Sequence, residues 1–441
     1  MHRILLQTLW LAGLWLSVPA GEAVGQTPMS LPDCIQYAYD NNPQIRIAQL
    51  QITDAECQIR ESKSIGYPQL SASIGYQYYL QRPGIPASAF FPGGGDEKVA
   101  FSAYHNLTPG VTWNQLLFSN SYLVGLRAAR YYKAYVEQQV AVTKRELRNA
   151  VTDAFLPALL ISENLAILDK NVGNLEKLLS ETRATSQAGF AEQLDVDRLE
   201  LSLSTLRAER DNLVRQREIV VNALKFAMGM PVNQEIALSG NVQQLLAEYA
   251  GADPGAEVNF SNRPEYVQLL KGRDLNAIQI ELYSKPWMPT VSAFVQYQPG
   301  FQGAFGNDTK WFFIPSALAG LSVNVPIWDG GTSRARRERA SISVQTIDAQ
   351  KQLLENAITL EVENARKQYL NAAERMKSQQ KNLDLAQRIY NTTQTKYKAG
   401  VGSSFELVSA EQQLYAAQQS LMQSQYDLLT ARVAIKKALG D

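Results

Sequence analysis

The feature that most constrains the fold is a segment from Thr332 to Ala399 that contains no glycine and no proline. It is dominated by Ala, Leu, Gln, Glu, Lys and Arg, most of which are strong helix formers. At ~1.5 Å per residue, roughly 68 residues would form a rod on the order of 100 Å long. Just before it, Leu321 to Ile327 alternates apolar and polar residues and breaks at Pro326 and Asp329-Gly330-Gly331. A strand that leads into such a rod indicates an elongated molecule.

The chain is also an internal duplication. Three pairs share the offset 221, given by 264 − 43, 289 − 68 and 297 − 76; later pairs are offset by 210 or 211. The sequence therefore predicts two copies of a helix-strand-strand-helix-helix unit. The matching pairs are Pro43 and Pro264, Pro68 and Pro289, Tyr76 and Tyr297, Gly110 and Gly320, Asn114 and Asn324, Gly189 and Gly400, Glu200 and Glu411, and Gly229 and Gly440.

We expect a signal peptide over 1–25, a first repeat over 26–230, an equatorial linker over 231–262 and a second repeat over 263–441. The loop between the first two strands, rich in Pro and Gly, carries no signal of regular structure. Expected strands cover about 68–81, 100–118, 289–300 and 311–328. Expected helices cover 31–66 with a corner at Pro43, then 120–188, 191–229, 263–287, 332–399 and 402–440.

The first residues are typical of a secretory signal. Arg3 precedes an apolar run from Ile4 to Val18, which is short for a retained membrane anchor. Cleavage is expected within residues 20–26, where small residues such as Ala20, Ala23 and Gly25 offer several sites. Export to an oxidising compartment would allow a disulfide between Cys34 and Cys57, although two unpaired, buried cysteines explain the sequence as well.

The strands suit a membrane. From Leu70 to Leu80 the residues alternate between an apolar and a polar face over about 11 positions, enough to cross a bilayer at a tilt. Half-buried strands of a soluble protein show the same pattern, but here four of them follow a signal sequence. Four strands cannot close a barrel and open edges do not persist in hydrocarbon, so the chain must oligomerise. Three protomers would supply twelve strands.

Composition excludes other classes of function. The chain has 42 Lys and Arg against 42 Asp and Glu, which does not favour binding to nucleic acid. Its two histidines, His2 and His105, make a histidine-centred active site or multi-histidine metal site untenable, since His2 lies in the leader. We find no nucleophile elbow, P-loop or metal-ligand spacing. The expectation is a protein without catalytic residues, cofactor or metal.

Two segments carry a resemblance to a known family. They are Val325-Pro326-Ile327-Trp328-Asp329-Gly330-Gly331 with Arg334 and Arg336, and Tyr397-Lys398-Ala399-Gly400 through Phe405-Glu406-Leu407-Val408 to Glu411, Leu414, Tyr426 and Leu439-Gly440. With the duplication, they make the mature chain resemble the TolC-like outer-membrane efflux proteins, also called outer membrane factors. The resemblance implies a mainly α fold with a transmembrane β-barrel, built as a homotrimer. Its twelve-stranded outer-membrane barrel would continue into a long periplasmic α-helical coiled-coil barrel.

The same resemblance implies partners and site residues. The partners would be a periplasmic adaptor, or membrane fusion protein, an inner-membrane transporter and outer-membrane lipid of a Gram-negative bacterium. The adaptor would contact two helical turns, at Gly189 and Phe190 and at Gly400, Val401 and Gly402. Asp384, Arg388 and Asn391, spaced by four and three, are candidates for a periplasmic aperture, although a solvated helix face has the same pattern.

Within the barrel, alternation assigns faces to strand residues. The lumen-facing candidates are Ser71, Ser73, Thr112, Asn114, Ser292, Ser322 and Asn324, and those facing lipid or its boundary are Tyr76, Trp113, Tyr297 and Trp328.

The leading hypothesis is thus a passive exit duct for small molecules in a tripartite efflux system. A type I protein-secretion duct is an alternative, and a second is a periplasmic coiled-coil scaffold or adaptor that has no pore and therefore no membrane strands. The sequence does not identify the cargo.

Overall fold

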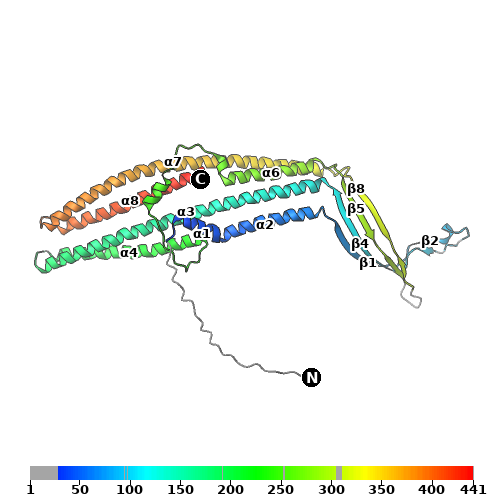
Figure 1. Cartoon of the computed structure of the whole chain (residues 1–441), viewed down its shortest axis with the longest axis horizontal. Coiled ribbons are helices and arrows are strands. Elements are labelled where there is room, and N and C mark those ends of the chain that lie inside the picture. The colour runs from blue at the N-terminus through cyan, green and yellow to red at the C-terminus, as the bar shows by residue number, and fades with distance from the viewer. Residues whose placement is uncertain are drawn as a thin grey trace, which may run out of the picture.

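The computed structural model describes residues 28–93, 95–96, 98–190, 192–251, 254–303 and 310–440, so the expected signal peptide lies outside the described residues. The molecule is long and narrow, with paired helices at one end and a curled sheet at the other (Figure 1). Its two longest helices, α3 (Asn120–Gln187) and α7 (Thr332–Lys398), run from the strands to the far helical end.

Each long helix is covered by two shorter ones laid end to end. Helices α2 and α4 pack on α3, and α6 and α8 pack on α7, while α6 also contacts α3. The arrangement reflects the duplication seen in the sequence. Each long helix has an apolar stripe along its length, and two shorter helices are needed to cover it. The bounds of the other helices are α1 (Leu31–Asn41), α2 (Pro43–Ser64), α4 (Gln193–Met228), α5 (Val242–Glu248), α6 (Pro264–Ser284) and α8 (Ser404–Leu439). Short 3₁₀ turns lie at Ala87–Ala89, Tyr249–Gly251 and Phe260–Asn262.

The corner between α1 and α2 follows from local chemistry. Helix α1 opens with a capping box between Ser30 and Asp33. Asn42 then ends α1 in an extended conformation, and its side chain accepts the Gln44 N–H at 2.8 Å to start α2. Pro43 takes the first position of α2, where its missing N–H costs nothing.

The two strand-to-helix joints differ. In the first repeat Ser119 alone separates β4 (His105–Phe118) from α3. In the second, residues 325–331 intervene, and Gly330 and Gly331 adopt φ of 67° and 85°. The Asp329 carboxylate accepts N–H bonds from Gly331 at 3.0 Å and Ser333 at 2.8 Å. These bonds, with the Ser333 side chain foremost, hold the pKa of Asp329 below its ordinary value and cap α7.

The strand expected over 311–328 is shorter and divided. Its main part, β8 (Ala317–Asn324), ends at Asn324, which pairs with Thr290, the first residue of β5 (Thr290–Tyr297). Beyond it no partner residue remains on β5, and Pro326 has no N–H to donate. Ile327 and Trp328, which the alternation placed in the strand or at its end, are therefore 96% and 87% exposed beyond the ladder.

Four long strands form the body of the sheet, in the order β1-β4-β5-β8, all antiparallel. β1 (Gln69–Tyr78) and β4 pair from Gln69 opposite Asn114 to Tyr78 opposite His105. A register shift between Leu116 and Phe118 bends β4 where it meets β5.

Sequence reasoning missed two small hairpins. β2 (Gly84–Pro86) pairs with β3 (Lys98–Ala100) inside the segment expected to lack regular structure. β6 (Gly300–Gly303) pairs with β4 and with β7 (Phe312–Ile314), which extends the sheet away from the helices. Strands of three or four residues are too short to show a period, so their pairing is set by partners distant in sequence.

The main hydrophobic core lies at mid-length, where α1, α3, α4, α5 and α8 meet. Phe155, Leu224 and Leu429 are fully buried there. Cys34 joins this core while Cys57 is exposed, and the two form no disulfide. Burial, aided by the charge of Asp33, raises the pKa of the Cys34 thiol to about 12. A second core, between α3, α4 and α8, extends toward the helical end of the molecule.

Candidate functional site

The sheet has one polar face. Residues directly opposite in an antiparallel pair share a side, so the register assigns faces across all four long strands. Ser71 lies opposite Thr112, Thr112 opposite Gln296, and Ser292 opposite Ser322. The apolar exceptions on this side include Phe294, whose ring lies over Gly320. All seven residues predicted to line a lumen fall on this face: Ser71, Ser73, Thr112, Asn114, Ser292, Ser322 and Asn324.

The opposite face is apolar and exposed. Leu70, Ile74 and Leu321 are 74%, 79% and 70% accessible, far more than a folded interior would leave. Three of the four residues predicted to meet lipid, Tyr76, Trp113 and Tyr297, lie on this face by the same register. The fourth, Trp328, follows the sheet instead of belonging to it. The sheet is thus two-sided, with an apolar surface that water alone would not favour.

Both outer edges of the four-strand body are open. Within the described residues β1 pairs only with β4, and β8 pairs only with β5. Each therefore presents one row of backbone N–H and C=O groups that has no strand partner in this chain.

The two helical turns at the far end are built alike. Gly189 and Gly400 adopt φ of 81° and 77°. The N–H of the next residue, Phe190 or Val401, donates to the carbonyl five residues back, on Thr185 or Lys396. This is the Schellman arrangement that ends helices at a left-handed glycine. Phe190 and Val401 occupy equivalent positions and are 86% and 78% exposed.

The second turn has an additional constraint at Gly402. A Cβ there would come within 3.0 Å of the Tyr397 backbone nitrogen, so a larger residue would not fit without a shift of the backbone.

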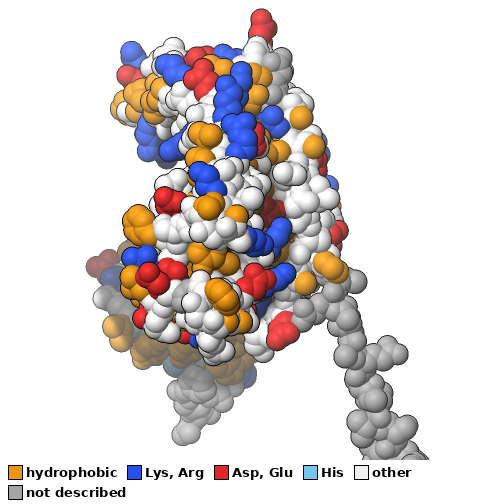
Figure 2. Space-filling view, turned by 90° about the vertical axis from the view of Figure 1, so that its left-hand side faces the viewer, with side chains coloured by type: hydrophobic (Ala, Val, Ile, Leu, Met, Phe, Trp, Pro, Cys, Tyr) orange, Lys and Arg blue, Asp and Glu red, His pale blue; other side chains and the backbone are white. Residues whose placement is uncertain are grey.

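The surface at this end of the molecule carries both hydrophobic and charged side chains, and Lys and Arg gather in its upper part (Figure 2). The final turn of α7 contributes Lys396 and Lys398, whose positive charges interact favourably with the negative end of the helix dipole.

The aperture candidates lie on an exposed stripe of α7. Asp384 accepts a hydrogen bond from Gln380 at 3.2 Å, and Asn391 accepts one from Gln387 at 2.9 Å. Arg388 is exposed on the same stripe. Among the described residues no hydrogen bond or ion pair joins these three to one another, and their neighbours on the packed side of α7 are Ala386 and Tyr390.

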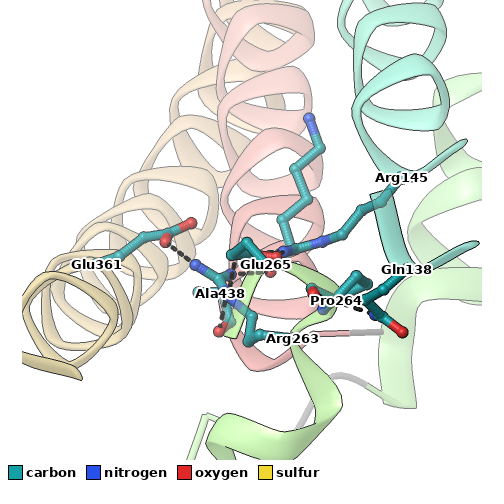
Figure 3. A network of polar contacts seen from close by, with 8 residues as sticks. Gln138, Arg145, Arg263, Pro264, Glu265, Glu361 and Ala438 are labelled. Carbon is teal, nitrogen blue, oxygen red and sulfur yellow. Dashed lines mark hydrogen bonds and ion pairs between the residues drawn. The ribbon is translucent and has the colours of Figure 1, made fainter. Parts of the chain in front are cut away.

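An arginine cluster, missed by the sequence reasoning, joins the helices at mid-length (Figure 3). Arg145 on α3 and Arg263 before α6 each donate to the Lys437 carbonyl at 2.5 Å. These two bonds cap the C-terminal end of α8. Arg263 also pairs with Glu361 on α7 and with Glu265 at 2.9 Å. Burial would raise the pKa of Glu265, but the hydrogen bond and charge of Arg145, with the charge of Arg263, lower it below its usual value. The one local feature in the sequence that points to this cluster is Arg263, which directly precedes Pro264 at the start of α6.

No group of three or more His, Cys, Asp and Glu side chains able to hold a metal occurs among the residues that the structure describes.

Comparison with known proteins identifies relatives of this chain among outer-membrane export proteins. The chain is 22% identical over 415 residues to a probable efflux pump outer membrane protein, TtgC, of Pseudomonas putida, covering 93% of this chain and 83% of that protein. It is 25% identical over 328 residues to the pyoverdine export outer membrane protein OpmQ of Pseudomonas aeruginosa, covering 73% and 65%.

Solved structures share the fold. The Neisseria gonorrhoeae MtrE outer membrane channel superposes with a TM-score of 0.69 at 17% identity, covering 93% of this chain and 88% of that one. VceC of Vibrio cholerae gives 0.67 at 14% identity, covering 93% and 96%. The family described as "Outer membrane efflux protein" matches residues 34–230 and 261–441. With its two-sided sheet and duplicated helices, this chain belongs to the outer membrane efflux protein family.

Proposed function

We propose that three copies of this chain form the outer-membrane exit duct of a tripartite efflux system, through which small molecules pass passively. The duct receives them from an inner-membrane transporter and a periplasmic adaptor. Membership of the family places the chain in the outer membrane, and its long helices would then extend into the periplasm.

The two-sided sheet with open edges carries the proposal. Its exposed apolar face suits lipid, and its polar face suits water. The free edges of β1 and β8 need partners in hydrocarbon, where an unpaired backbone group costs several kcal/mol. Joining β8 of one copy to β1 of the next satisfies both edges, and three copies supply twelve long strands.

The helical turns would be the docking surface for the adaptor. Phe190 and Val401 project one apolar side chain from each turn, and exposed apolar groups at rigid turns serve well as contact anchors. Lys396 and Lys398 add positive charge beside the second turn.

The pore-free scaffold predicted no membrane strands, whereas this chain has four long strands with an exposed apolar face. A protein-secretion duct would share the same barrel, so the cargo class has to come from export measurements.

Adjacent residues on opposite faces test the duct. Thr112→Cys and Val111→Cys would be made in a Cys57→Ser background, because Cys57 is exposed and Cys34 is buried. In planar bilayers, a charged thiol reagent should change the single-channel conductance of the Thr112→Cys variant and leave that of Val111→Cys unchanged. Equal effects at both positions would contradict the assignment of faces.

Oligomeric state is measured on the same preparation. Native mass spectrometry in detergent should give three copies per particle. A stable monomer without conductance would overturn the duct.

A further inference from the structure

A cavity of about 330 Å³ lies between α3, α4 and α8, in the part of these helices between the arginine cluster and the helical turns. Its apolar wall is formed by an isoleucine and leucines of α3, leucines of α4, and a valine and an alanine of α8. Its charged lining consists of two glutamates, and no lysine or arginine lines it. The size is at the lower end of the range for small-molecule sites. The lining includes Leu168 of α3, Leu201 and Glu209 of α4, and Glu411 and Ala416 of α8.

Glu411 is the unusual member of this lining. It is only 3% exposed, on α8. Among the described residues its carboxylate receives a hydrogen bond from Tyr415 and forms no ion pair. Burial raises the pKa of Glu411, although the Tyr415 bond acts the other way. An ionised carboxylate that is buried without a cation is costly, so such a group is normally paired with a cation, binds one, or takes up a proton.

The duplication supplies an internal comparison. Glu200 occupies the position equivalent to Glu411 in the first repeat, at an offset of 411 − 200 = 211. It is exposed and paired with Arg183. The position 211 residues after Arg183 is Gln394, whose amide bonds to the Tyr390 hydroxyl instead. The second repeat therefore keeps the carboxylate, buries it beside a cavity and lacks the arginine that neutralises its counterpart.

We propose that this cavity binds a small organic cation, a protonated amine with an apolar body, through the carboxylate of Glu411. The ammonium group replaces the missing arginine, and the apolar body lies against Leu168 and Leu201. The Tyr415 side chain, which also lines the cavity, donates a hydrogen bond to the carboxylate and adds an aromatic surface to the site. The proposed binding does not depend on the proposed duct.

Occupancy would have a structural consequence. The cavity lies where α8 of the second repeat meets α3 and α4 of the first, and hydrogen bonds beside it already join the repeats, from Asn171 to Gln418 at 3.0 Å and from Gln419 to Glu209 at 3.1 Å. A ligand in contact with all three helices would tie the repeats together. It should therefore stabilise the protein in proportion to its occupancy.

Benzylammonium is a suitable probe, with benzyl alcohol as its neutral isostere and benzoate as its anionic one. Binding to the full-length protein in detergent would be measured by isothermal titration calorimetry at about pH 8, where the amine is protonated. We expect benzylammonium to bind at least roughly tenfold more tightly than benzyl alcohol, and benzoate not to bind. Equal binding of amine and alcohol would overturn the proposal.

Variants locate the site. Glu411→Gln should remove the preference for the amine, whereas Glu200→Gln, the matched change in the first repeat, should leave it intact. Ala416→Leu should fill the cavity and abolish binding of both amine and alcohol. Unchanged amine binding in Glu411→Gln would refute the role of that carboxylate. Should this variant fail to fold, the amine-to-alcohol ratio of the wild type and Ala416→Leu still decide the question.

Discussion

Arg263 donates to the Lys437 carbonyl at 2.5 Å, and this bond joins the start of one short helix to the end of another. Arg263 immediately precedes α6, while Lys437 lies in the last turn of α8, and both helices rest on α7. The Arg263 side chain is only 5% exposed, so its partners neutralise a charge that is largely shielded from water.

Replacing Arg263 should reduce the stability of the folded protein. Arg263→Ala removes the cation that pairs with Glu361 and frees the Ala438 carbonyl. It leaves Glu265 and the Lys437 carbonyl with Arg145 as their remaining arginine partner. Because Glu361 is half-exposed, we expect a loss of about 2 kcal/mol, less than for a fully buried pair. Thermal unfolding in detergent measures it. The matched control, Arg127→Ala, breaks the exposed pair with Glu281 and should cost below about 1 kcal/mol; equal losses would argue against the clamp.

Glu265 should make the protein acid-sensitive. Its folded-state pKa is lowered, so its stabilising contribution is present above the unfolded value of 4.5 and is lost as pH falls through the folded value. Glu265→Gln should therefore reduce stability at neutral pH and flatten the acid limb of the curve of melting temperature against pH. An acid limb identical to that of the wild type would show that other carboxyls dominate.

The contribution of Glu411 to stability should depend on pH in the opposite direction. Its raised pKa means that the stabilising effect of the neutral carboxyl is full below 4.5 and is lost as pH rises through the folded value. The titratable groups around it are Tyr415 on α8, Tyr390 on α7 and Glu209 on α4, and neither tyrosine supplies a positive charge. Glu411→Gln should thus melt higher than the wild type at neutral pH, with the difference vanishing below 4.5. A lower melting temperature at neutral pH would contradict this.

Asp329 should control the start of α7. Asp329→Ala removes the acceptor for the N–H groups of Gly331 and Ser333. Hydrogen exchange of a peptide covering these residues should speed up, while exchange at the start of α3 stays the same because Ser119 caps that helix independently. Unaltered exchange in the α7 peptide would show that the cap is dispensable.

The aperture residues give a test of gating. If Asp384 and Arg388 narrow the tip of a trimer, replacing both with Ala should raise single-channel conductance in planar bilayers. Glu374→Ala, on the same helix but farther from the turn, is the control and should leave conductance unchanged. Unchanged conductance in the double variant would remove these residues from the gate.

Much of the architecture was predictable because it is encoded locally. Helix lengths follow from Gly, Pro and capping residues, so α3 and α7 end within one residue of the expected positions. Strand faces follow from period-2 alternation, and the observed register places all seven polar candidates on one side. The duplication made both results more secure, since each copy repeats the pattern of the other.

The remaining features depend on partners distant in the chain. Where β8 ends was decided by the first residue of β5, and the hairpins β2–β3 and β6–β7 exist only through pairing. Likewise Arg263 meets Lys437 and Glu361 only because α6 and α8 abut on α7. By itself the sequence determined two copies of a strand-helix unit with an apolar and a polar sheet face, since periodicity is a local property. Only the tertiary structure decided that Glu411 is buried without a cation whereas Glu200 is paired, because burial and ion pairing depend on which helices pack together.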